Sequence, residues 1–260
     1  MNGLLKTPAG LIGAQLIALV VIILLWWGAA IAAVLPPAVL PTPYAVGRAF
    51  AELVTDSVYW AAIGNTLIGA LQGFVAAIIV GIPVGMLTGR SRFAEESGRF
   101  LVEFGRSFPT IALLPVLVLI LGATTPMKAV VVFTATLFPL IIQVQHGARR
   151  IEPSITETIQ AYRIPPMLRV VKVVLPTAAP FIATGIKLAA TVSVLVSLGV
   201  EVLGGVPGVG RQLTMAQQDG APDFAFAYIF TAGVLGFGVN AIVGLLRDKL
   251  VRWDTADTEE

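Results

Sequence analysis

The stretch AAIGNTLIGALQGFVAAIIVGIPVGMLT, residues Ala61–Thr88, carries no charged side chain and is closed by the basic residues Arg90 and Arg92. At about 1.5 Å of rise per residue, a helix of this length crosses a hydrocarbon core of roughly 30 Å. Along this span, glycines repeat at four-residue spacing, which lets a second helix approach the backbone closely; they are Gly69 and Gly73, then Gly81, Gly85 and Gly89. The stretch predicts a membrane helix whose glycine face serves either ordinary packing or a gate.

Similar apolar blocks recur along the whole chain. Of the 260 residues, 57% are hydrophobic and 12% are charged, whereas soluble domains have roughly 25% charged residues. The blocks lack the alternation of polar and apolar residues that membrane β-strands show. We therefore predict an all-α, polytopic membrane protein with one domain over residues 1–260 and six spans, at about Leu11–Leu35, Ala61–Thr88, Ser107–Gly122, Ala129–Gly147, Val173–Val200 and Phe226–Leu246.

Two spans have features of their own. The first resembles a secretion signal, but its apolar run is too long for a signal core and continues into Trp26 and Trp27, so we interpret it as an uncleaved helix. The third contains Pro109 and Pro115, which break the ladder of helical hydrogen bonds. Irregular backbone at membrane depth is tolerated only beside protein or a water-filled cavity, so we expect this span to bend near a translocation path.

Basic residues predict the orientation of the chain. With both termini in the cytoplasm, the inner segments collect Lys6, Arg90, Arg92, Arg99, Arg106, Arg149, Arg150, Arg163, Arg169, Lys172, Arg247, Lys249 and Arg252, and the outer ones keep only Arg48, Lys128 and Arg211. Cytoplasmic loops of membrane proteins are enriched in lysine and arginine. The asymmetry therefore favours cytoplasmic N and C termini.

The inner connection between the fourth and fifth spans, residues 148–172, carries a local helix signal. Ser154 and Glu157 have the spacing of a capping box, and Pro165 with Pro166 ends the helix about ten residues later. Ile155, Ile159 and Tyr162 fall on one face, giving an apolar stripe outside the membrane. Such a helix either lies on the inner leaflet or docks into another protein.

At this connection the sequence resembles the transmembrane subunits of binding-protein-dependent ABC importers, in the branch that handles nitrate, taurine and aliphatic sulfonates. Their loop pattern is E-A-A, three residues, G, nine residues, I, one residue, L-P. In register with it stand Glu157, Thr158 and Ile159, then Arg163, then Val173, Leu175 and Pro176. The alanines and the glycine are replaced here. Other matching segments are LPTPYAVGRAF, GIPVGMLTGRS, FGRSFPTIALLPVLVLILG, ARRIEP and GLLRDKLVRWD.

The resemblance implies a type I importer permease of the bacterial plasma (inner) membrane that forms the path of a small solute. It implies a second permease subunit, identical or not, two cytoplasmic ATP-binding subunits and an extracytoplasmic solute-binding protein, with ATP and Mg held by the ATP-binding subunits, no cofactor on this chain and no nucleic acid. The segment Gly204–Asp223, with a short helix around Gln212–Gln218, is expected to meet the binding protein. The coupling helix would comprise Ser154, Glu157, Thr158, Ile159, Gln160, Tyr162 and Arg163.

Candidate residues of the solute path are the polar, charged and helix-breaking residues of the later spans, namely Pro115, Gln143, Lys187, Thr191, Ser197 and Glu201. Lys187 and Glu201 are the charges of the fifth span. An ionised side chain in a membrane is costly, so each is expected to face protein or water, in a structural role or in contact with the solute. His146 is the only histidine and the chain has no cysteine, which excludes a multi-histidine or thiolate metal site.

ATP hydrolysis by this chain is not indicated, because it needs the motif G-x-x-x-x-G-K-[ST] and the nearest run, Gly205–Gln212, has arginine and glutamine at its end. Two other functions compete with this interpretation. An integral membrane enzyme needs a nucleophile with its base or an acidic metal site, and neither pattern is visible. An ion-coupled secondary transporter or a channel usually carries several charges within its spans, and here they are few.

Overall fold

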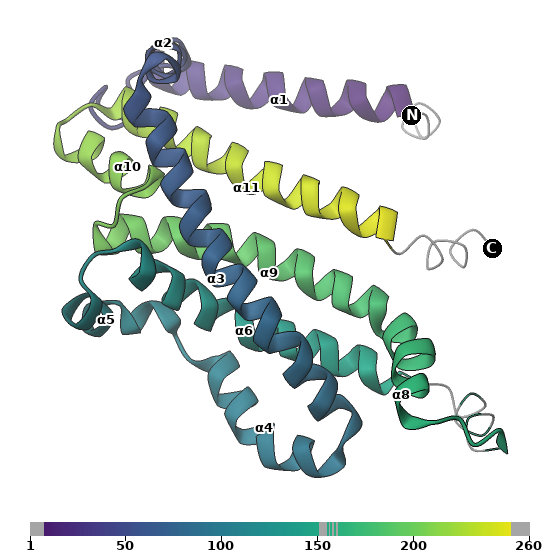
Figure 1. Cartoon of the computed structure of the whole chain (residues 1–260). Helices are drawn as coiled ribbons and strands as arrows, with labels where there is room; N and C mark the ends of the chain where they lie inside the picture. Colours follow the sequence, from purple (N-terminus) through teal and green to yellow (C-terminus); the bar gives the residue numbers. More distant parts are fainter. Residues whose placement is uncertain (1–7, 151–154, 156, 158, 160, 251–260) are drawn as a thin grey trace. The chain divides into compact units, whose positions relative to one another are not determined.

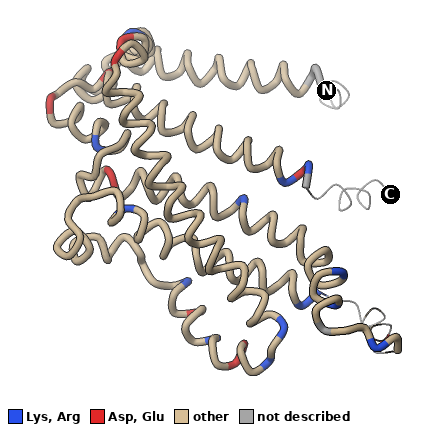
Figure 2. The backbone as a smooth tube through the Cα atoms, viewed as in Figure 1, with Lys and Arg blue, Asp and Glu red and all other residues tan. Residues whose placement is uncertain are grey.

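The computed structural model describes residues 8–150, 155, 157, 159 and 161–250, and every regular element among them is helical. Five helical stretches are long and apolar enough to cross a membrane, and a bent pair adds a sixth if it is counted as one span. The five are Leu11–Ile31, Ser57–Arg90, Thr125–Arg149, Met167–Gln218 and Pro222–Lys249. The all-α class of membrane protein is thereby confirmed, and Figure 2 shows long uncharged stretches of helix with charges gathered mainly toward the ends.

The chain divides into two compact units, Met1–Trp60 with Gln212–Thr231 (unit 1) and Ala61–Arg211 with Ala232–Glu260 (unit 2). Three helices continue from one unit into the other: α3 (Ser57–Arg90), α10 (Val209–Gln218) and α11 (Pro222–Leu250) (Figure 1).

Unit 1 is organised around α1 (Pro8–Ile31), α2 (Pro43–Thr55) and aromatic side chains. Thr42 starts α2 because its hydroxyl accepts a hydrogen bond from the Ala45 N–H at 3.2 Å, and proline fits the first helical position that follows. The Trp26 indole donates to the Pro41 carbonyl at 3.0 Å and stacks on Phe226. A short helix therefore follows the proline-rich segment, and Trp26 holds α1 beside it.

In unit 2, the glycine face of α3 packs on α6 (Thr125–Arg149). A Cβ built on Gly73 would lie 2.6 Å from the Val132 Cβ, and one on Gly85 would lie 2.6 Å from the Val144 Cβ. Each later glycine of α3 contacts a residue further along α6, so the two helices run in the same direction. The same repeat continues through Gly81 and Leu140 and through Gly89 and Ala148. The predicted close approach is thus observed, and the neighbour is α6.

Helix α9 (Leu175–Gly204) packs on α6 in the opposite direction, with α8 (Pro166–Arg169) and the π-helical segment η3 (Val170–Val174) leading into it. Gly147 lies against Phe181, and Gly185 lies against Gln143. Buried Leu140, Val144 and Ala189 form one core cluster at this contact. Helix α6 is therefore packed between α3 and α9.

The predicted third span, Ser107–Gly122, does not form one straight helix. Instead α4 (Arg92–Ser107) is followed by a break, a 3₁₀ turn η2 (Thr110–Leu113) and α5 (Leu114–Leu121), and the two halves meet at 82°. Phe108 is extended (φ −73°, ψ 127°) because the following proline disfavours the helical conformation. The expected bend is present. The residues Arg92, Arg99 and Arg106, which the sequence placed in a connecting segment, belong to α4.

We predict that Gly85→Ala lowers the thermal unfolding temperature of the purified protein. Its methyl group would lie 2.9 Å from the Ile141 carbonyl oxygen, and overpacking of this kind costs about 1–3 kcal/mol. Gly64→Ala on the same helix is the matched control, because nothing lies within 4 Å of its added Cβ. Equal unfolding temperatures for the two variants would contradict the packing of α3 on α6.

Candidate functional site

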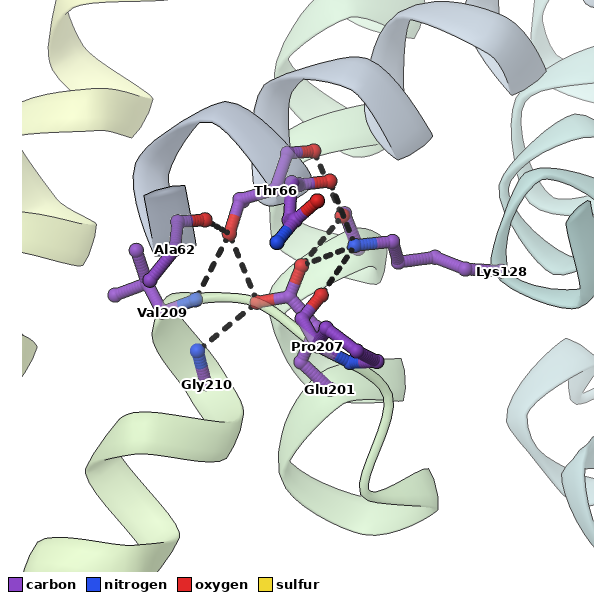
Figure 3. A network of polar contacts seen from close by, with 9 residues as sticks. Ala62, Thr66, Lys128, Glu201, Pro207, Val209 and Gly210 are labelled. Carbon is purple, nitrogen blue, oxygen red and sulfur yellow. Dashed lines mark hydrogen bonds and ion pairs between the residues drawn. The ribbon is translucent and has the colours of Figure 1, made fainter. Parts of the chain in front are cut away.

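A buried ion pair joins α6 to α9. The ammonium of Lys128 donates to Glu201 Oε1 at 2.7 Å, to the Asn65 carbonyl at 2.9 Å and to the Pro207 carbonyl at 3.1 Å (Figure 3). Both side chains are fully buried, at 0% relative exposure. A lysine ammonium carries three protons, so each proton has an acceptor.

The Glu201 carboxylate is equally well satisfied. Oε1 also lies 3.2 Å from the Ser197 hydroxyl, while Oε2 lies 3.0 Å from the Thr66 hydroxyl and accepts from the Gly210 N–H at 2.9 Å. A carboxylate offers about four acceptor positions, and here four donors surround it. The Val209 N–H donates to the Thr66 hydroxyl at 3.0 Å. We call Thr66, Lys128, Ser197 and Glu201 the buried network.

The buried network closes on the N-terminus of α10. Val209 and Gly210 are the first two residues of that helix, where backbone N–H groups lack helical partners and the helix dipole favours a negative charge. The preceding loop needs glycine for this approach: a Cβ on Gly208 would overlap the Glu201 carboxylate, and one on Gly210 would lie 2.6 Å from the Leu198 carbonyl oxygen. Glu201 therefore holds α9, α6, α3 and the start of α10 together.

Lys128 is the residue that the sequence interpretation misplaced. It was assigned to an outer connecting segment, but α6 begins at Thr125, after the N-cap Thr124, and Lys128 lies in the first turns of that helix. Two features could have found it: the T-x-P start just before it, and the need of Glu201 for an opposite charge in an apolar span. The pair was missed because its members are far apart in the sequence.

The structure separates the six candidate path residues into two groups. Ser197 and Glu201 belong to the buried network, where every polar atom has a partner inside the protein, so their contacts favour a structural role. Pro115 is exposed at the start of α5, Gln143 borders a hollow on α6, and Lys187 and Thr191 lie on α9. A role for these four in the path stays a prediction.

The expected coupling segment is helical at Ile155, Glu157 and Ile159, whereas Ser154, Thr158 and Gln160 lie outside the described residues. The Ile159 side chain is buried and Tyr162 is 79% exposed, so the apolar stripe is not one free surface. The Ile164 N–H donates to the Ile159 carbonyl at 3.1 Å, and Arg163 has φ of +46°. The helix thus ends in a left-handed turn, before the prolines that were expected to stop it.

Among the residues that the structure describes, no group of three histidine, cysteine or acidic side chains is arranged to hold a metal ion. The site is a set of buried polar contacts that fastens membrane helices to one another. The buried network and the helical fold together define a polytopic membrane protein. In unit 2, hydrogen bonds and an ion pair hold α3, α6 and α9 together at one end.

Comparison with known proteins identifies the family. Residues 77–253 match the binding-protein-dependent transport system inner membrane component. The chain is 30% identical over 197 residues to a bicarbonate transport system permease protein of Synechococcus elongatus, covering 75% of this chain and 67% of the relative. It is 27% identical over 197 residues to a nitrate import permease protein of Leptolyngbya laminosa, covering 76% and 71%.

A solved structure shares the fold. An inward-facing form of the MetNI methionine ABC transporter superposes with a TM-score of 0.63 at 21% identity, over 75% of this chain and 95% of that one. The chain belongs to the family of binding-protein-dependent inner membrane components. It is a multi-pass permease subunit of a bacterial ABC importer, a transport component rather than a catalyst.

We predict that Lys128→Met destabilises the protein by about 3–5 kcal/mol, because it leaves a buried carboxylate without its counter-charge. Adding Glu201→Gln should recover most of this loss, since the neutral amide can still accept from the Gly210 N–H. Thermal unfolding in detergent measures both effects. The control is Arg92→Met, which removes an ion pair to Glu96 whose arginine side chain is 91% exposed and should cost at most about 1 kcal/mol. Independent, additive effects of the two buried substitutions would contradict the coupling.

Proposed function

We propose that two copies of this chain form the path of a small anionic solute through the plasma membrane. A binding protein delivers the solute outside, and two ATP-binding subunits power its release inside. The family carries the general function, and the importer relatives named for bicarbonate and nitrate support an anionic cargo. The buried network supports the outer part of the proposal, because it holds Val209 and Gly210, the first residues of the helix whose later part, residues 212–218, is proposed to meet the binding protein.

The proposed orientation has both termini in the cytoplasm. The basic residues at the Arg90 end of α3, on α4 and at the Arg149 end of α6 support it, because positive charge collects on the cytoplasmic side. In this orientation the buried network lies toward the outer face and the coupling segment lies inside.

Labelling of single introduced cysteines tests this orientation, since the natural chain has none. A membrane-impermeant maleimide added to intact cells should modify Asp219→Cys, which lies on the proposed outer face. It should modify Arg92→Cys only after the membrane is opened. Both positions are exposed in the structure, so that reactivity reports sidedness. Labelling of Arg92→Cys in intact cells would reverse the topology.

The coupling segment, residues 155–163, is proposed to pass the motion of the ATP-binding subunits to the spans. Ile159 is buried within this chain and anchors the segment, while exposed Tyr162 remains available to a partner. The left-handed Arg163 ends the helix abruptly, which gives a short lever joined to α6 and α9. A rigid connection matters because a partner shifts a conformational equilibrium only through contacts that differ between the states.

We expect Tyr162→Asp to weaken the binding of the ATP-binding subunit by roughly tenfold or more, as loss of an aromatic anchor does at interfaces. The measurement is the amount of that subunit retained when the permease is purified from cells that express the whole importer. Tyr44→Asp is the matched control, because Tyr44 on α2 is also exposed, at 67%, and lies outside the segment. Ile159 is unsuitable for this test, since aspartate there would disturb folding.

The variant Arg163→Gly separates two roles of Arg163 in the same experiment: its backbone conformation and the contact of its side chain with the ATP-binding subunit. Glycine adopts the left-handed conformation without strain, so the permease should gain about 1 kcal/mol of stability. If the arginine side chain also meets an acidic residue of the ATP-binding subunit, retention should fall modestly. Full retention of the subunit by Tyr162→Asp would refute the coupling assignment.

A further inference from the structure

Lys187 is a charged residue of a membrane helix that takes no part in the buried network. It is the only charged residue between Lys172 and Glu201 in the sequence, and it lies near the middle of α9. Lys128 and Glu201 neutralise each other. Among the described residues, no carboxylate oxygen lies within 4.0 Å of the Lys187 ammonium; that includes Asp248, one turn beyond Gly244 on α11. An ionised residue within a span is functional by default.

The surroundings of Lys187 are rich in donors. Its ammonium lies against α11, where a Cβ on Gly244 would be 3.4 Å from Nζ. One turn back on α11, the Asn240 side-chain oxygen lies 3.3 Å from the hydroxyl of Thr191, which is one turn beyond Lys187 on α9. Within the described part of the chain, the Asn240 amide nitrogen has no acceptor. Lys187, Thr191 and Asn240 therefore form a cluster with unused N–H donors and no negative charge.

A second cation, Arg150 at the C-terminal end of α6, lies beside the N-terminal half of α9. Pro180, Phe181 and Thr184 line a hollow of about 220 Å³ with Gln143 and Arg150 of the neighbouring helix end. The Arg150 guanidinium lies over the Phe181 ring, 5.2 Å from its centroid. Thr184 falls on the same face of α9 as Lys187, one turn away. The polar face of this helix thus leads from one positive charge to another, with no carboxylate in the lining of the hollow.

We infer that Lys187, Thr191 and Asn240 form a binding station for a small anion on its way through the membrane. The bound group is an oxyanion with several acceptor oxygens, which accepts hydrogen bonds from the Lys187 ammonium and from the Asn240 amide N–H. The hollow beside Arg150 is its next position. The inference rests on the proposed function, because an anion meets this face of α9 only if the helix borders the solute path. The contrast with Lys128 carries the inference: that lysine has three acceptors, whereas Lys187 has no carboxylate partner within the described ranges.

Thiol reactivity of the permease in liposomes tests the station without its partners. Thr191→Cys provides the only thiol, and its rates of reaction with an anionic sulfonatoethyl and a cationic trimethylammonioethyl methanethiosulfonate are compared. We expect the anionic reagent to be favoured, and Lys187→Gln to lower the anionic-to-cationic rate ratio on the order of tenfold. Lys187→Arg should preserve the ratio, because it keeps the charge. Arg92→Gln is the matched control and should leave the ratio unchanged, since that arginine is exposed on α4.

Two results would overturn the station. No reaction with either reagent would mean that this face of α9 is sealed by lipid or protein. A ratio that is the same with and without Lys187 would mean that the ammonium does not set the local potential. Neither result touches the Tyr162 experiment, which measures the binding of the ATP-binding subunit. Conversely, failure of that experiment leaves the reactivity ratio at Thr191→Cys as a separate measurement of the station.

Discussion

The contact between Lys128 and Glu201 is the constraint on which one end of unit 2 depends. Two opposite charges, both fully buried, are tolerated there because each has its full set of hydrogen-bond partners. The partners come from α3, α6, α9, the loop that follows α9 and the start of α10. None of these elements can move alone without leaving a buried charge or donor unsatisfied. The ion pair thus holds these helices together. The glycine-rich loop between α9 and α10 contacts it closely because Gly208 and Gly210 carry no side chains.

Helix α6 carries most of the remaining organisation of that unit. Glycines of α3 let it approach from one side, and α9 packs on it from another through Gly147 and Gly185. Within a membrane, association of helices depends on close packing and interhelical hydrogen bonds, because lipid tails are as apolar as the side chains. Small residues at regular spacing are therefore the means by which α6 acquires two neighbours.

The charges of the spans serve different purposes according to their partners. The buried network pairs the charges at one end, whereas the ammonium of Lys187, near the middle of α9, has no carboxylate partner among the residues that the structure describes. The proposed anionic cargo would need such an arrangement, since a fully neutralised path would offer an anion no compensation for lost water. At the other end, the segment proposed for coupling ends in a left-handed turn at Arg163, next to the exposed Tyr162.

The sequence by itself determined the class of the protein, because apolar blocks of this length must cross the lipid bilayer as helices. It also determined the family, the break at Pro109 and the glycine face of α3, since each depends on neighbouring residues. It did not reveal that Lys128 pairs with Glu201, that α4 is a helix or that Ile159 is buried. Those facts depend on residues brought together from distant parts of the chain. Only the tertiary structure decided that Lys128 is neutralised and that Lys187 has no carboxylate beside it in the described part of the chain, because partners of a buried charge are set by packing rather than by spacing.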